Sequence, residues 1–142
     1  IMIVLITNIL WILYSMLEGF REGFYWYFKG ISKSKNDFEI HPVFASQRGI
    51  ILILIGVMLS FTIGWFSILN TVGMALVFSF FHNGSYYVTR NRIDSKVYPL
   101  KWKSQSTTST AKLTKIMTYR NRTIFMIIGL IIQVAYLLFG LL

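Results

Sequence analysis

Cysteine is absent from this chain of 142 residues, which excludes disulfides, thiolate metal sites and cysteine nucleophiles. Acidic residues are also scarce. The chain contains five Asp and Glu and 14 Lys and Arg, which gives a net charge of +9. Charged residues make up 13% of the chain and apolar residues 55%, against about 25% and about 45–50% in soluble domains. A soluble core cannot absorb this much apolar surface, so we expect the lipid bilayer to be the solvent.

Several catalytic signatures are missing as well. The sequence contains no His-Glu-x-x-His zinc motif, no Gly-rich nucleotide loop and no Gly-x-Ser-x-Gly nucleophile elbow. The excess of basic residues accompanies long apolar runs, which favours anionic lipid head groups over nucleic acid as the partner.

The apolar runs predict an all-α, polytopic integral membrane protein in which four transmembrane helices form a small helical bundle. We expect one transmembrane domain over residues 1–142, with spans at about 1–28, 48–66, 69–87 and 111–142. Polar loops are expected at about 29–47 and 88–110. The first apolar run is expected to be a retained span, because neither a basic segment before it nor a small-residue cleavage site after it is present.

Local signals place the ends of these helices. His41 precedes Pro42, which biases His41 away from helical dihedrals. Ser109 or Thr110 is expected to cap a helix that starts at Ala111 and enters the last span. The connection between the second and third spans is short and uncharged, so these two helices are expected to form a hairpin.

Small residues recur every four positions along the second span, at Gly56, Ser60 and Gly64. This pattern lets a neighbouring helix approach closely. We expect the stripe to pack inside the bundle rather than to form an oligomer face, although self-association stays open.

The distribution of positive charge predicts the orientation in the membrane. Every Lys and Arg lies in the two polar loops or in the helix ends beside them. Because positively charged loops stay in the cytoplasm, both termini are expected outside and both charged loops in the cytoplasm or its equivalent.

Ionisable residues near the ends of the first and third spans are the candidate functional site. Glu18 and Glu22 are one helical turn apart and share a face. At 1.5 Å per residue, Glu22 lies about 10 Å along the helix from Lys29, and His82 about 12 Å from Arg90. Glu22 and His82 should therefore face each other at similar depth.

These residues allow two interpretations. As a functional site, Glu18, Glu22 and His82 would act as acid–base groups on a lipid head group, or bind a divalent metal together with His41. Three arginines could then hold a lipid phosphate or head group: Arg21, Arg48 and Arg122. As the alternative, which we favour, the same residues are interface residues in contact with head groups.

We therefore expect a structural, assembly or accessory subunit of a membrane complex or of a membrane-containing virus, in contact with anionic lipids and as part of a homo-oligomer or larger complex. The first alternative is an interfacial membrane enzyme that uses Glu18, Glu22 and His82. The second alternative, a pore-forming or transport protein, requires one shared polar path lined by Asn8, Glu18, Ser60, Thr62, Asn70 and Gln133.

Overall fold

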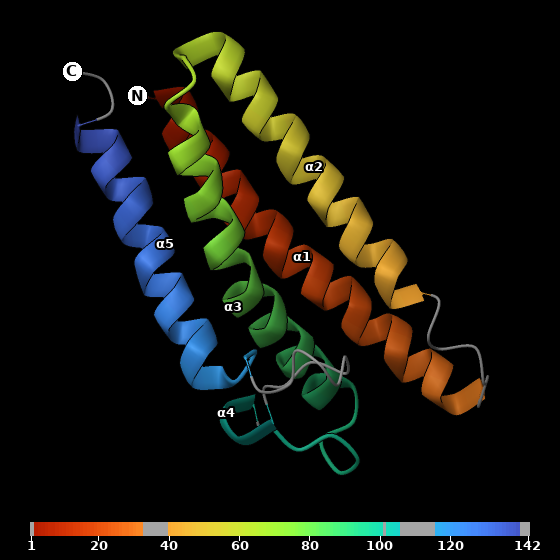
Figure 1. The fold of residues 1–142 in the computed structure, drawn as a ribbon. Helices are drawn as coiled ribbons and strands as arrows, with labels where there is room; N and C mark the ends of the chain where they lie inside the picture. The colour runs from red at the N-terminus through yellow and green to blue at the C-terminus, as the bar shows by residue number, and fades with distance from the viewer. Residues whose placement is uncertain (1, 33–39, 101, 106–115, 140–142) are drawn as a thin grey trace.

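A computed structural model describes residues 2–32, 40–100, 102–105 and 116–139, with side chains throughout except at 29–32, 40–42 and 104–105 (Figure 1). Within these residues the chain forms four long helices and one short helix, and no strand is present. The helices are α1 (Met2–Ser32), α2 (Ile40–Ile63), α3 (Ser67–Ile93), α4 (Trp102–Gln105) and α5 (Tyr119–Phe139). The all-helical prediction is confirmed.

The long helices run alternately up and down, and α3 is the central one (Figure 1). It packs along α1 on one side and α5 on the other, and α2 also packs against it. The start of α1 and the end of α5 lie at the same end of the bundle as the turn between α2 and α3, while α4 lies at the opposite end (Figure 1). The predicted hairpin of the second and third spans is thus present as α2 and α3.

The outer surface of the bundle is rich in apolar side chains, and its interior contains many polar ones. Large apolar side chains cover the outer faces of α1, α2 and α5, with Phe61 at 88% exposed as the extreme case. The buried positions, in contrast, include many polar side chains, among them Asn8, Asn70 and Thr89. Such a bundle suits a solvent of hydrocarbon, in which polar groups must find partners inside the protein.

Three of the helices are long and apolar enough to cross a membrane, over Met2–Phe28, Val43–Ile63 and Tyr119–Phe139. The remaining predicted span, at 69–87, is not confirmed by length and composition, because the corresponding helix α3 carries too many polar residues. Several of them, including Asn70, Asn83 and Thr89, are buried against neighbouring helices. The polarity of α3 therefore reflects its central position.

The starts of α2 and α5 bear on two further predictions. The helix α2 begins at Ile40, so His41 and Pro42 lie in its first turn, where the missing N–H of proline breaks no helical hydrogen bond. The last helix begins at Tyr119, and residues 116–118 precede it as a turn. Thr118 Oγ1 accepts a hydrogen bond from the backbone N–H of Asn121 at 3.3 Å, as an N-cap residue does. The predicted caps at 109 and 110 and the predicted start at 111 lie outside the described residues.

The small-residue stripe on α2 serves two purposes. Gly56 faces Thr71 of α3, where a Cβ would lie 3.0 Å from Thr71 Cγ2. Ser60 Oγ lies 3.2 Å from Ser67 Oγ at the start of α3. Gly64, by contrast, follows the end of α2 and adopts a φ of +93°, a left-handed conformation that favours glycine. Two members of the stripe thus pack inside the bundle and the third forms the turn.

Candidate functional site

The predicted site begins with two carboxylates on α1. Glu18 and Glu22 lie one turn apart, and each side chain is only 7% exposed. Arg21, on the same helix, donates from Nη2 to Glu18 Oε2 at 2.9 Å, and its own side chain is 46% exposed. Burial of two neighbouring carboxylates is costly unless cations from other elements compensate for them.

Arg48 of α2 supplies that compensation. Its Nη2 lies 2.6 Å from Glu22 Oε2, and its Nε lies 3.4 Å from Glu18 Oε2. The guanidinium carbon also lies 5.4 Å from the ring centroid of Phe78 on α3. One arginine therefore contacts both carboxylates of α1 and an aromatic ring of α3, and joins three helices.

His82 of α3 completes the cluster. Its Nε2 lies 2.8 Å from Glu22 Oε2, and its ring stacks on Phe78 with 5.3 Å between centroids. Trp26 Nε1 donates a hydrogen bond to the other oxygen, Glu22 Oε1, at 3.2 Å. The expectation that Glu22 faces His82 is confirmed as geometry, and a catalytic role for either residue stays a prediction. We call Glu18, Arg21, Glu22, Arg48 and His82 the charged cluster.

Close helix packing explains why the cluster can form. A Cβ at Gly19 would overlap the backbone carbonyl oxygen of His82, and a Cβ at Gly23 would lie 2.9 Å from Thr89 Cβ. Glycine at both positions lets α1 approach α3 closely, as small residues do in membrane helices. The residues between Gly19 and Gly23 include Glu22, which this approach brings next to His82.

This geometry gives little support to the predicted metal site. Among the described residues, no group of three or more His, Cys, Asp or Glu is placed to hold a metal ion. Arg48 lies against both carboxylates, where a cation would bind. The side chain of His41, the fourth predicted ligand, lies outside the described residues.

The three arginines that were predicted to bind phosphate do not all bond to the same partners. Arg21 and Arg48 contact the carboxylates described above. Arg122, at the start of α5, is buried and donates to the carbonyl oxygen of Met117 at 2.9 Å, to the carbonyl oxygen of Ser79 at 3.2 Å and to Ser79 Oγ. Arg122 therefore joins α5 to α3.

The polar residues proposed for a shared path are bonded in separate groups. Asn8 and Asn70 form reciprocal amide hydrogen bonds at 3.0 and 2.9 Å. Ser60 contacts Ser67, and Thr62 bonds to carbonyl oxygens of its own helix. These groups have local partners, whereas the buried Gln133 Nε2 has no hydrogen-bond partner among the described residues. Nothing in these contacts requires a common path, and the pore remains an untested prediction.

The chain matches no protein-family profile, no curated protein and no solved structure.

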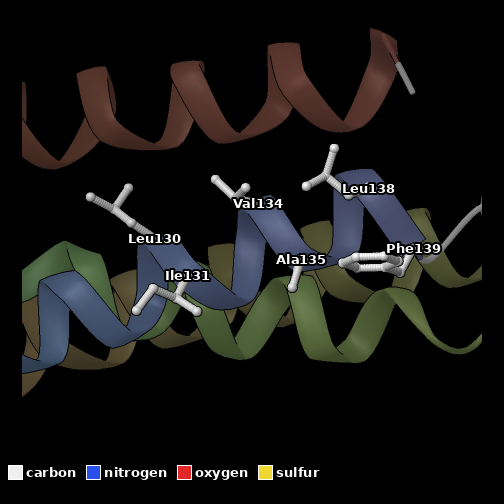
Figure 2. A pocket seen from close by; sticks show the side chains of 6 residues that line it. All are labelled: Leu130, Ile131, Val134, Ala135, Leu138 and Phe139. Carbon is white, nitrogen blue, oxygen red and sulfur yellow. The ribbon is translucent and has the colours of Figure 1, made fainter.

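Two open hollows are lined by described side chains, and neither includes a residue of the charged cluster. One lies on α5, where Leu130, Val134 and Leu138 project toward the side on which α1 lies (Figure 2). All six side chains that line this hollow are apolar. A surface of this kind suits lipid chains better than a polar substrate.

Sequence reasoning missed two features of the site. Arg48 was expected to bind phosphate, although it compensates for two carboxylates. Trp26 was not among the predicted site residues, although it donates to Glu22. The signal that could have found the packing is the spacing of Gly19 and Gly23 on the helix that carries the carboxylates.

Proposed function

We propose that the chain is a multi-pass integral membrane protein in which all four long helices cross the bilayer. The apolar outer surface supports this proposal, as does the burial of the polar residues of α3 against other helices. Both charged loops would lie on the cytoplasmic side and both termini outside. Extraction with alkaline carbonate tests the membrane insertion: the protein should stay in the membrane pellet, and its release into the supernatant would contradict the proposal.

Within that membrane, we propose that the chain acts as a structural, assembly or accessory subunit rather than as an enzyme. The observation that carries this proposal is the mutual compensation in the charged cluster. Glu18 contacts Arg21 and Arg48, while Glu22 contacts Arg48, His82 and Trp26. Buried polar groups that bond to one another join helices and make a bundle rigid.

The partners would be anionic lipids and other protein subunits. Four exposed basic side chains occupy the end of the bundle that carries α4, where lipid phosphates would be in reach: Arg92, Lys96, Lys103 and Arg120. The apolar faces of α2 and α5 would contact either lipid chains or a second protein chain.

Mass measurement of the protein in lipid nanodiscs tests the subunit role. Light scattering should report oligomers, or assemblies with another membrane protein that is co-expressed. In a separate assay, the protein should release no head groups from phospholipid vesicles. A monodisperse monomer that turns over phospholipid would contradict the subunit role.

A second function is favoured by one specific observation, the 2.8 Å contact between Glu22 Oε2 and His82 Nε2. A carboxylate that orients an imidazole is a common acid–base arrangement in enzymes. An interfacial enzyme of this kind would lose at least about 100-fold of its turnover on Glu22→Gln or His82→Asn. The matched control is Gln47→Ala, which changes an exposed residue of α2 outside the charged cluster.

A further inference from the structure

Arg21 differs from the other two arginines that were predicted to bind lipid phosphate. Its side chain is 46% exposed, whereas that of Arg48 is 17% exposed and Arg122 is buried. Arg48 pairs with both carboxylates of α1, and Arg122 donates to three oxygen atoms. Arg21 donates a single hydrogen bond within the described part of the chain, from Nη2 to Glu18 Oε2. A guanidinium has five N–H donors, so the described residues leave most of the Arg21 donors unused.

The exposed side chain of Arg21 lies at one end of an apolar stripe on the outer face of α1. Leu10, Leu13 and Leu17 are exposed and lie on the same face of the helix as Arg21. This stripe suits the acyl chains of lipid, among which a charged side chain is costly. From Met2 to Arg21 the helix rises by about 28 Å, close to the hydrocarbon thickness of about 30 Å. In the proposed orientation, Arg21 therefore lies where the acyl chains of the cytoplasmic leaflet end and the head groups begin.

The ring of Phe44 on α2 supports the guanidinium of Arg21 between the two helices. The guanidinium carbon lies 4.9 Å from the ring centroid, and the ring packs edge-on against Tyr25 with 5.7 Å between centroids. Glu18, whose side chain is only 7% exposed, contacts the guanidinium from the protein side. The position of the charge is thus fixed by the protein, while the unused N–H groups of the half-exposed side chain can be reached from the lipid.

We propose that Arg21 binds the phosphodiester group of a phospholipid in the cytoplasmic leaflet, beside Phe44 and between α1 and α2. The planar guanidinium suits this ligand, because two of its N–H groups can donate in parallel to two phosphate oxygens. The site is distinct from the four exposed basic side chains near α4. The proposal rests on the membrane insertion proposed above, and it connects the charged cluster to the lipid through one residue.

Solid-state NMR distances between carbon and phosphorus test this proposal. The protein is labelled with ¹³C at the arginine Cζ atoms and inserted into vesicles of phosphatidylcholine and phosphatidylglycerol in a phosphate-free buffer. The signal of Arg21 is identified by its disappearance in Arg21→Lys, and that of Arg122 by its disappearance in Arg122→Lys. Arg122 is the matched control, because it is buried and its donors are used inside the protein. Arg21→Gln and Arg122→Gln remove the same signals and replace a lysine variant that does not fold.

The expected result is that recoupling to ³¹P reduces the Arg21 signal, with a carbon–phosphorus distance of about 4 Å, because the N–O distance in such a bond is about 2.8 Å. The Arg122 signal should keep its intensity on the same timescale. An Arg21 signal that keeps its intensity would overturn the proposal, as would an equal reduction of both signals. If that protein still stays in the membrane pellet after carbonate extraction, the proposed membrane insertion stands and only the phosphate site is refuted.

Discussion

Alanine substitution at three glycines should change the stability of the bundle in a graded order set by the space around each one. Gly49 on α2 has nothing within 4 Å of the position that a Cβ would take. Gly49→Ala should therefore leave the free energy of unfolding unchanged or raise it by up to about 1 kcal/mol, because alanine favours a helix over glycine.

Gly129 on α5 meets α3 at close range. A Cβ there would lie 2.7 Å from the carbonyl oxygen of Gly73, 2.9 Å from Val77 Cγ1 and 3.0 Å from Leu76 Cβ. Ordinary contacts begin near 3.4 Å, so α5 would have to move away by about 0.7 Å. Overpacking of this kind typically costs about 1–3 kcal/mol, which is the loss expected for Gly129→Ala.

Gly19 on α1 has even less room, because its Cβ would overlap the carbonyl oxygen of His82 and lie 3.1 Å from Ser85 Cβ. Neither contact can be relieved by rotating a long flexible side chain, so Gly19→Ala should cost at least as much as Gly129→Ala. The shift of α1 should also lengthen the distance from Glu22 to His82.

Reversible unfolding of each variant in mixed micelles, with increasing SDS and circular dichroism as the readout, gives the free energies. Gly49→Ala should be the most stable variant and Gly19→Ala the least. If Gly19→Ala unfolds within about 0.5 kcal/mol of Gly49→Ala, the close packing of α1 on α3 is refuted.

Three further predictions use the same unfolding measurement. The Asn8–Asn70 amide pair should show a coupling energy of about 0.6–1.7 kcal/mol in a double-mutant cycle with alanine, and a value near zero would contradict the pairing. Gly64→Ala should cost about 1–2 kcal/mol because of the left-handed φ of +93°, and a neutral effect would mean that the turn adopts another conformation. Trp11→Phe should cost about 0.5–1.5 kcal/mol, since Trp11 Nε1 donates to the carbonyl oxygen of Met74 at 2.7 Å; an unchanged stability would argue against that bond.

The pairing of Glu22 with His82 could be predicted because the rise of an α-helix is fixed. Counting from Lys29 on one helix and from Arg90 on the other places both side chains at similar depth. The count needs only that the two helices end at the same side of the bundle, which the hairpin of α2 and α3 ensures.

The partner of the carboxylates could not be predicted in this way. Arg48 reaches Glu18 and Glu22 only because the start of α2 lies beside α1. Whether these two segments lie side by side depends on the crossing angles of the helices. The sequence signal around Arg48, a cation just before an apolar run, is equally typical of a residue that contacts lipid phosphate.

The helix α3 shows a second limit of sequence reasoning. Hydropathy measures how well a helix suits lipid, whereas Asn70, Asn83 and Thr89 are buried against protein. In the proposed membrane arrangement, the neighbouring helices would shield these polar side chains from lipid. The start of α2 at Ile40 was missed for a different reason, since Pro42 resembles a helix breaker but is tolerated in a first turn.

The most direct test of the account is whether α3 crosses the membrane. Trp65 lies in the turn before α3 and Ser95 just after its end, and both side chains are exposed. Single cysteines at these positions can be reacted with a membrane-impermeant maleimide in right-side-out and inside-out vesicles. The account predicts that Trp65→Cys reacts only from the outside and Ser95→Cys only from the cytoplasmic side. Reaction of both cysteines from the same side would contradict it.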